Sequence, residues 1–496
     1  MQKTILILFA TILFSITAIG QAPSILSNRA YGGTNYDAAT CITKTNDGGY
    51  VIAGRTLSAD GDLVGAGLHG WNGDCMVIKL SAAGEVEWSK AYGGFAGEIF
   101  NSIKQTSDGG YIAAGITNSL GDDVQTGPGG WVVKLAPNGD IQWQARAGNF
   151  AYDAVQTTDG GYAVGGDNYI MKFNPAGILQ WTYNTQLTVY KSLCPTADGG
   201  CTAAGEGNGT FRAIEFRITK LSSSGVMEWE QDYGGTGDDN PLAIKPTVDG
   251  GYIVAGCTST RNDGQVTGQH GQYDFWVIKL SSTFVLEWAK ALGGSMHDIA
   301  YDVIQTNDGG YVVVGETYSF DGDVPRAETE YPVDGWVVKL SSSGNLVWQK
   351  PIGGSNNDHF RGIVQNADNS YTIVGFTSSN TTAGFHPDPL GSFVPDAWFV
   401  NLASDVNLAV DQNKTFTKNV KLYPNPATEN IYIDFDQDEF SNASYQLFDN
   451  QLKMIQAGNL CRNKNEVNLS QLPPAIYFIR IQKENENPRL FKIIKK

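Results

Sequence analysis

The stretch from Tyr92-Gly93-Gly94 to Trp143 holds the unit from which most of this chain is built. It contains the turn Thr106-Ser107-Asp108-Gly109-Gly110-Tyr111, then an apolar run that ends at Gly115, a polar loop, and two further apolar runs. Closely similar segments recur from the N-terminus to about residue 402. The architecture should therefore follow from the repetition of one small unit.

The turn aspartate marks each copy of this unit. Successive aspartates are 39 to 61 residues apart, which is the size of a four-stranded propeller blade with loops of variable length. A seventh, degenerate copy reads Ala367-Asp368-Asn369-Ser370-Tyr371. The six regular copies have this residue at Asp47, Asp108, Asp159, Asp198, Asp249 and Asp308. Seven copies predict seven blades.

Each copy is expected to form four short strands, because β-branched and aromatic runs alternate with Gly, Asn and Asp. The Asp-Gly-Gly turn supplies the positive φ angle that a tight hairpin between the first two strands requires. Helical periodicity is absent, so the class is all-β. In the second copy the strands are expected at 101–106, 111–117, 131–136 and 141–147.

The two ends of the repeat array complement each other. The seventh copy stops after Asp396 to Leu402, its third strand, whereas residues 25–33 match the end of a fourth strand at 86–94. We expect 25–31 to complete the last blade and close the ring, which would remove an open sheet edge. An open solenoid is the alternative.

Tryptophan recurs at one place in the third strands and one place in the fourth strands. A residue repeated in this way is better explained by packing between blades than by ligand stacking. Function is therefore expected where the copies differ. The long, irregular segments all join the second strand to the third, at 56–73, 117–129, 258–273, 317–333 and 377–395.

These segments should share one face, the long-loop face, with the links between blades. Copies three and four nearly lack the loop, so the face should be low there. Long loops on a rigid scaffold are a usual place for recognition.

An acidic residue recurs on the same face, four residues after the second glycine of the Tyr-Gly-Gly element. A ring of carboxylates would suit Ca²⁺, which prefers several oxygen ligands. The alternative is that each carboxylate caps its own turn through backbone N–H groups. The copies have Asp37, Glu98, Asp239, Asp298 and Asp358, and we assign Asp153 and Lys191 to this position in copies three and four.

All histidines fall on this face: His69, His270, His297, His359 and His386. A cluster of them would suit a transition metal or acid–base chemistry, and solvated loop histidines are the alternative. Asp60-Gly61-Asp62 and Asp321-Gly322-Asp323 resemble fragments of a calcium loop, although the EF-hand spacing is absent. No cofactor is certain from the sequence, and calcium at Asp60, Asp62, Asp321 and Asp323 is the candidate.

The N-terminus reads as a signal peptide at residues 1–20, with Lys3, an apolar core and small residues before a cleavage site. The mature chain is thus expected to leave the cytoplasm without a transmembrane segment. The net charge of −17 argues against nucleic acid as a partner. The cysteines lack metal-site spacing, and Cys194 and Cys201, which flank one turn, are candidates either for a disulfide or for free buried thiols.

Composition shifts after the repeats. Residues 21–403 form the expected propeller, 404–418 a polar linker, and 419–496 short alternating strands typical of a small immunoglobulin-like β-sandwich. This last segment resembles the type A C-terminal sorting domain of the type IX secretion system of Bacteroidota, through Tyr423-Pro424-Asn425-Pro426, the segment from Leu469 to Ile481, and the basic end with Lys495 and Lys496. Ala475 stands where that family usually has glycine.

The resemblance implies passage through the periplasm, recognition by the type IX machinery, removal of the domain, and release or attachment at the cell surface. No phosphate loop, nucleophile elbow or His-Glu-x-x-His motif is present. The first functional hypothesis is a module that binds an extracellular glycan or protein through the long-loop face. The alternatives are an extracellular hydrolase or lyase that uses acids or histidines of that face, and a structural or adhesive surface component.

Overall fold

The chain divides into two compact units, Met1–Ser404 and Asp405–Lys496. The computed structural model describes residues 22–208, 213–325, 333–379, 394–405, 420–435, 443–448, 454–460, 465–483 and 489–496. The expected signal peptide lies outside these ranges. Over the described residues the named elements are strands apart from the 3-10 turn η1 (Gly61–Leu63), so the all-β class is confirmed. None of the helical structure in this part of the chain is long and apolar enough to span a membrane.

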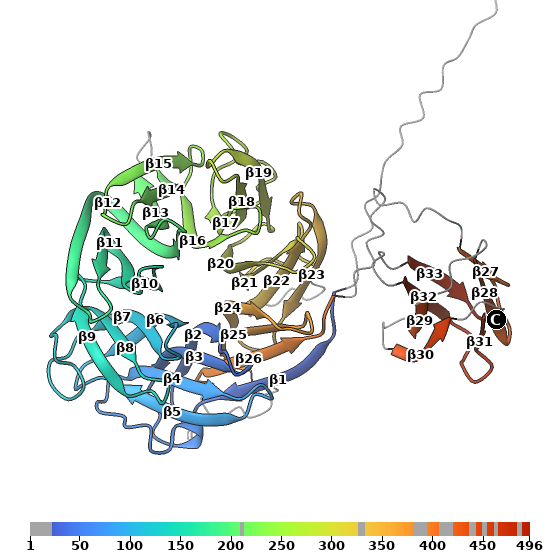
Figure 1. Cartoon of the computed structure of the whole chain (residues 1–496), viewed down its shortest axis with the longest axis horizontal. Helices are drawn as coiled ribbons and strands as arrows, with labels where there is room; N and C mark the ends of the chain where they lie inside the picture. Colours follow the sequence, from blue (N-terminus) through green and yellow to red (C-terminus); the bar gives the residue numbers. More distant parts are fainter. Residues whose placement is uncertain are drawn as a thin grey trace, which may run out of the picture. The chain divides into compact units, whose positions relative to one another are not determined.

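The first unit consists of antiparallel sheets arranged around a centre (Figure 1). Four of the sheets contain four consecutive strands each, and their first strands lie nearest the centre. The sheets of copies one and two are β2 (Asp37–Lys44), β3 (Tyr50–Thr56), β4 (Asp74–Leu80) and β5 (Val86–Tyr92), and β6 (Glu98–Gln105), β7 (Tyr111–Thr117), β8 (Gly129–Leu135) and β9 (Ile141–Arg146). The sheets of copies five and six are β16 (Asp239–Pro246), β17 (Tyr252–Thr258), β18 (Asp274–Leu280) and β19 (Leu286–Leu292), and β20 (Asp298–Gln305), β21 (Tyr311–Thr317), β22 (Asp334–Leu340) and β23 (Leu346–Ile352).

Copies three and four share one six-stranded sheet. Its strands are β10 (Ala151–Gln156), β11 (Tyr162–Phe173), β12 (Leu179–Pro195), β13 (Cys201–Asn208), β14 (Ile214–Leu221) and β15 (Met227–Tyr233). β11 continues through the place where other copies leave the sheet in a long loop, and β12 spans the end of copy three and the start of copy four. β12 therefore joins the two copies into one sheet, because it pairs with β11 of copy three and with β13 of copy four.

The N-terminal strand joins the last sheet, whose order is β1 (Ile25–Tyr31), β26 (Asp396–Leu402), β25 (Tyr371–Thr377) and β24 (Asp358–Gln365). β1 runs antiparallel to β26 from Ile25 opposite Leu402 to Tyr31 opposite Ala397. The Trp398 indole N–H donates to Asn28 Oδ1 at 2.5 Å. The sheet that contains β2 packs against this last sheet, since β2 contacts β24, β25 and β26.

The repeated residues occupy scaffold positions, as the sequence predicts. The first glycine of each regular turn has a positive φ, for example 81° at Gly109, and the hairpin assignment is confirmed. Trp131 is fully buried, and fourth-strand Trp88 packs on Tyr111 of the next sheet at 6.3 Å between ring centroids. Trp143 lies in the same way 5.4 Å from Tyr162. The interpretation of these tryptophans as packing between blades is therefore confirmed.

The second unit has two sheets around a common core. One contains β27 (Val420–Tyr423), β28 (Asn430–Phe435) and β31 (Asn465–Asn468), and the other β29 (Ala443–Phe448), β30 (Met454–Leu460), β32 (Ile476–Lys483) and β33 (Arg489–Ile494). Ile431 and Val467 of the first sheet and Leu447 and Ile479 of the second are fully buried in that core.

The cysteines of the first unit are free thiols. Cys194 and Cys201 are both buried, and burial raises the pKa of each thiol to about 12. Of the two interpretations of this pair, the structure supports free buried thiols.

Candidate functional site

The repeated acidic residue of the long-loop face is a turn cap. Asp37 is fully buried; its Oδ2 accepts hydrogen bonds from the Gly33 N–H at 2.8 Å and from the Ser58 hydroxyl at 2.7 Å. The hydroxyl of Thr56 donates to the other oxygen at 2.5 Å. The equivalent carboxylates accept a glycine N–H in the same way: Glu98 from Gly94 at 3.2 Å, Asp239 from Gly235 at 2.9 Å, Asp298 from Gly294 at 2.8 Å and Asp358 from Gly354 at 2.7 Å. These contacts favour the capping interpretation over a ring of ligand-binding carboxylates.

Burial dominates the electrostatics of these carboxyl groups. It raises the pKa of Asp37 and of Asp239 to about 6, although the hydrogen bonds to each group act in the opposite direction. The pKa values of Glu98, Asp298 and Asp358 are raised for the same reason. Burial in the scaffold therefore sets the pKa values of these carboxyl groups.

Two of our assignments to this position were wrong. In β10 the register shifts between Ala151 and Asp153, and in β20 it shifts between Ala300 and Asp302. Asp153 is therefore the counterpart of Asp302, one place beyond the shift. Lys191 lies inside the corresponding shift of β12, between Tyr190 and Ser192. Neither residue begins its inner strand, because the link before the bulge is shorter in copies three and four. Trp88 precedes the extra residue of β6 by 13 positions, whereas Trp143 precedes that of β10 by nine.

Two of the histidines bridge neighbouring sheets. His69 Nδ1 lies 2.8 Å from Asp74 Oδ2, and His69 Nε2 lies 3.5 Å from Asp123 Oδ2 of the next copy. His270 Nδ1 lies 3.1 Å from Asp274 Oδ2 in the equivalent place. Burial lowers the pKa of His69, but the carboxylates of Asp74 and Asp123 outweigh this effect and raise the pKa above its ordinary value.

The remaining histidines of the described part of the chain have partners of their own. His359 Nδ1 is 2.6 Å from Glu316 Oε2, which Arg361 also contacts at 2.8 Å. Against the effect of burial, these two partners lower the pKa of Glu316 to about 2. His297 stacks on Tyr273 with ring centroids 5.4 Å apart. His386 falls outside the described residues.

The suggested calcium aspartates hold loops to links. Asp60 Oδ1 accepts the Thr34 N–H at 2.8 Å, and Asp62 Oδ2 accepts the Gly32 N–H at 3.3 Å. Asp321 Oδ1 accepts the Ser295 N–H at 2.7 Å, and Asp323 Oδ2 accepts the Gly293 N–H at 3.3 Å. Within the described ranges, no group of three or more His, Cys, Asp or Glu side chains is placed to hold a metal ion.

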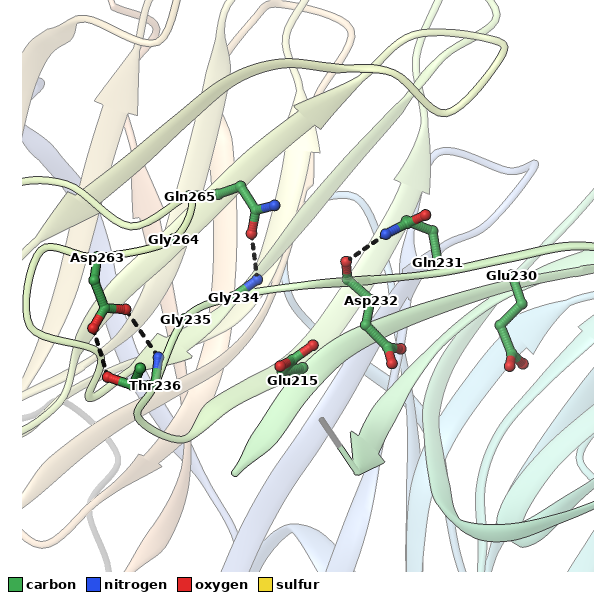
Figure 2. Close-up of a pocket in the computed structure, with 10 residues that line it drawn as sticks. All are labelled: Glu215, Glu230, Gln231, Asp232, Gly234, Gly235, Thr236, Asp263, Gly264 and Gln265. Carbon is green, nitrogen blue, oxygen red and sulfur yellow. Dashed lines mark hydrogen bonds between the residues drawn. The ribbon is translucent and has the colours of Figure 1, made fainter. Parts of the chain in front are cut away.

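A groove on the long-loop face brings several polar side chains together (Figure 2). It has a volume of about 660 Å³ and lies beside copy four, where the sequence predicts the low side of the face. We call it the acidic groove. Its walls are Glu215, Glu230, Gln231, Asp232, Gly234, Gly235, Thr236, Asp263, Gly264 and Gln265.

The groove is built from β14, β15, the link that follows β15 and the loop of copy five. Asp263 accepts the Thr236 N–H at 2.9 Å and its hydroxyl at 2.5 Å, and Gln265 Oε1 accepts the Gly234 N–H at 2.9 Å. Figure 2 shows these bonds at one end of the groove. Gln265 makes the bond that Asp62 makes in copy one, which shows that this tie between loop and link needs no charge.

Arg217 supplies the counter-charge. It forms a two-point contact with Asp232, at 2.8 Å for both Nε to Oδ1 and Nη2 to Oδ2, and it lies 3.8 Å from Glu230. Glu230 Oε2 accepts the Thr219 hydroxyl at 2.9 Å. The sequence missed these groove residues because they come from separate segments and match no motif; the short loop of copy four was the one signal of their position.

In the second unit the structure joins the two signature segments of its sequence. Asn425 donates from its side-chain amide to the Lys492 carbonyl at 2.7 Å, and its Oδ1 accepts the Ile494 N–H at 2.9 Å. Lys495 Nζ donates to the Thr428 carbonyl at 2.7 Å. Residues 421–496 match the family model described as the secretion system C-terminal sorting domain. The C-terminal unit is a type IX sorting domain. The protein is therefore delivered by the type IX secretion system and is secreted or held at the cell surface.

Solved structures resemble the chain at TM-scores below 0.5. A protein of unknown function from Bacteroides caccae has a TM-score of 0.35 and 14% identity, over 59% of this chain and 96% of that one. The Pan2 WD40 domain of Neurospora crassa has 0.45 and 12%, over 77% and 95%. Sqt1 from Chaetomium thermophilum has 0.43 and 12%, over 76% and 99%. No curated protein sequence matches this chain.

Proposed function

We propose that this protein is an exported binding module that recognises an extracellular glycan or protein through its long-loop face. The acidic groove carries the proposal. It presents carboxylates, amides and glycine backbone in an open polar surface, and no histidine lines it. Polar side chains on a preformed scaffold favour ligand binding, whereas acid–base catalysis would call for a closed pocket with a poised titratable pair.

The scaffold is, in our proposal, a seven-bladed propeller that the N-terminal strand closes. The six-stranded sheet counts as two blades, because β12 pairs with β11 over its first part and with β13 over its second. The pairing of β1 with β26 supports the closure. So does the contact between the first and last sheets, where Tyr50 lies 5.5 Å from Phe399 and donates to Asn366 at 2.7 Å.

The chemistry of the groove suits a ligand rich in hydrogen-bond donors. Asp232 and Asp263 are already engaged by Arg217 and Thr236, which fixes their geometry. Glu230 is held less tightly, since its Oε1 is 3.8 Å from Arg217. Sugar hydroxyls or the cationic side chains of a protein would complete the hydrogen bonds of such acceptors.

The test is a glycan array, followed by titration calorimetry with the glycans that bind. Glu230→Gln should weaken binding tenfold or more. Glu228→Gln is the matched control, because Glu228 is on the same strand but pairs with Lys220 at 2.7 Å and does not line the groove. Equal effects of the two substitutions would contradict the proposal. So would binding that neither changes, or the absence of any bound glycan together with the absence of a captured surface protein.

A further inference from the structure

A second cavity lies at the centre of the first unit, away from the acidic groove. Its volume is about 560 Å³. Its wall is made by the inner strands β2, β6, β10, β12, β16, β20 and β24. We call it the central channel.

Each of these strands has an irregularity at the same place. The register with the neighbouring strand shifts by one residue, so that one extra residue is inserted between two paired ones. Such a bulge re-aims a side chain. The extra residue lines the channel in every case: Thr40, Asn101, Tyr152, Lys191, Leu242, Tyr301 and Arg361.

A glycine on the neighbouring strand leaves room for the bulge. In β7, a Cβ on Gly115 would lie 2.0 Å from the Ile99 carbonyl oxygen, just before the bulge in β6. Glycine is therefore required opposite the bulge. The glycine repeats from copy to copy, whereas the residue that the bulge presents does not. The channel is thus a place where a constant backbone carries variable side chains.

The channel concentrates positive charge in an acidic protein. Lys104, Lys191, Lys245 and Arg361 line it together with the carboxylates of Asp153 and Asp302. The net charge of the whole chain is −17. Four cations from four different strands therefore converge on a wall that has two anions.

Both wall carboxylates are saturated by the protein itself. Asp153 accepts the Leu193 N–H at 2.8 Å, the Ser102 hydroxyl at 2.5 Å and Lys104 Nζ at 2.5 Å. Asp302 accepts the Ile363 N–H at 3.1 Å and pairs with Lys245 at 3.1 Å. Their role is to fasten neighbouring inner strands, because in both cases the N–H belongs to the next copy.

The cations keep donors to spare. A lysine ammonium has three donors, and within the described part of the chain Lys191 pairs with a single carboxylate, Glu206, at 3.5 Å. Its Nζ also lies 4.0 Å from the centroid of the Tyr152 ring. Arg361 is held 3.6 Å from the Tyr301 ring centroid and 2.8 Å from Glu316. Glu206 and Glu316 do not line the cavity.

We propose that the central channel is a binding site for a small anion whose charge is carried by carboxylate or sulfate oxygen atoms. Lys191 and Lys245 bind these oxygen atoms directly, and Arg361 contributes a fixed positive charge above Tyr301. A neutral or cationic molecule of the same size does not satisfy the excess of N–H donors. This site is separate from the acidic groove and prefers ligands of the opposite charge.

Titration calorimetry on the chain with both units intact tests the proposal. The probes are glucuronate, glucose 6-sulfate and inorganic sulfate, with glucose and glucosamine as the neutral and cationic comparisons. The anions should bind, the other two should not, and raising NaCl from 50 to 500 mM should weaken the binding. The preference between glucuronate and the sulfated sugar identifies the source of the charge.

Variants locate the site. Lys191→Gln and Lys245→Gln should each weaken anion binding tenfold or more, and Lys191→Arg should retain it. Lys90→Gln is the control, since Lys90 pairs with Asp140 at 2.5 Å outside the channel and its loss should leave anion binding unchanged. Near-ultraviolet circular dichroism establishes that each variant is folded. Binding of glucose as strong as that of the anions, no heat with any anion, or equal losses in all three glutamine variants would overturn the proposal.

Discussion

Lys134 Nζ in β8 lies 2.9 Å from Asp108 Oδ2, so a buried strand residue neutralises the exposed aspartate of the hairpin turn. The lysine side chain is 2% exposed and the aspartate 52%. Asp108 Oδ1 also accepts the Thr106 hydroxyl at 2.5 Å and the Gly110 N–H at 3.1 Å. The same pair recurs as Lys79 with Asp47, Lys172 with Asp159, Lys220 with Asp198, Lys279 with Asp249 and Lys339 with Asp308.

Asp108→Asn should destabilise the first unit, because a buried ammonium group would lose its counter-charge. We expect the free energy of unfolding to fall by about 1–3 kcal/mol, with a matching drop in Tm by scanning calorimetry. Asp140→Asn is the control, since Asp140 pairs with Lys90 at the surface and exposed pairs contribute little. An equal drop in Tm for both variants would show that the burial of Lys134 is irrelevant.

The buried turn caps predict how stability depends on pH. Burial raises the pKa of Asp37 and Asp239 to about 6, so the folded state holds these protons to higher pH than the unfolded state does. Their contribution to stability is present below their ordinary pKa of about 4 and is lost as pH rises through 6. Stability should therefore fall between about pH 4 and pH 6.

Other carboxyl groups limit stability on the acid side. Against the effect of burial, the partners of Asp249 and Glu316 lower their pKa values to about 2, and these contributions are lost as pH falls from 4 toward 2. Tm measured from pH 3 to pH 8 should have its maximum near about pH 4. Asp239→Asn should flatten the decline between about pH 4 and pH 6. A Tm that rises steadily from pH 4 to pH 8 would contradict this assignment.

The sequence predicted what repeats, because periodic residues follow periodic structure. The turn glycines, the tryptophans and the acidic cap at Asp37 recur at fixed spacing, and their roles could be inferred from that spacing alone. The seventh copy illustrates the limit. Asn401 takes the place of the buried lysine and accepts the Thr372 hydroxyl at 2.7 Å, so a neutral network replaces the ion pair there. The sequence shows that asparagine replaces the lysine, but not the hydrogen bond that replaces the ion pair.

The channel could not be predicted from spacing. The links before the bulge are shorter in copies three and four, and counting along the chain therefore placed Asp153 and Lys191 at the start of their inner strands rather than at the channel wall. The acidic groove was equally hidden, since Glu230 and Asp263 are brought together by packing between copies. Aligning the inner strands at the glycine opposite the bulge would have exposed the variable position.

The N-terminal strand should be needed for a soluble monomer. Deletion of residues 22–31 removes the partner of β26 and leaves an open sheet edge, which promotes association between chains. Size-exclusion chromatography with light scattering should show oligomers or aggregate. Tyr31→Phe is a milder change that removes the hydrogen bond to the Gly84 carbonyl at 2.5 Å and should cost about 1 kcal/mol without altering mass. A truncated chain that stays monomeric with an unchanged Tm would show that β1 is dispensable.

Asn425 should be needed for secretion, because its side chain fastens the turn at 423–426 to the last strand through Lys492 and Ile494. Asn425→Ala removes both hydrogen bonds and should loosen the C-terminal residues within a sorting domain that the type IX machinery must bind. We expect the variant to accumulate inside the cell while its amount in the medium or at the surface falls severalfold, as measured by immunoblotting of fractions. Asn459→Ala is the matched control, since Asn459 is exposed on β30 and its loss should leave secretion unchanged. Normal export of the Asn425 variant would show that the machinery reads the domain without this tie.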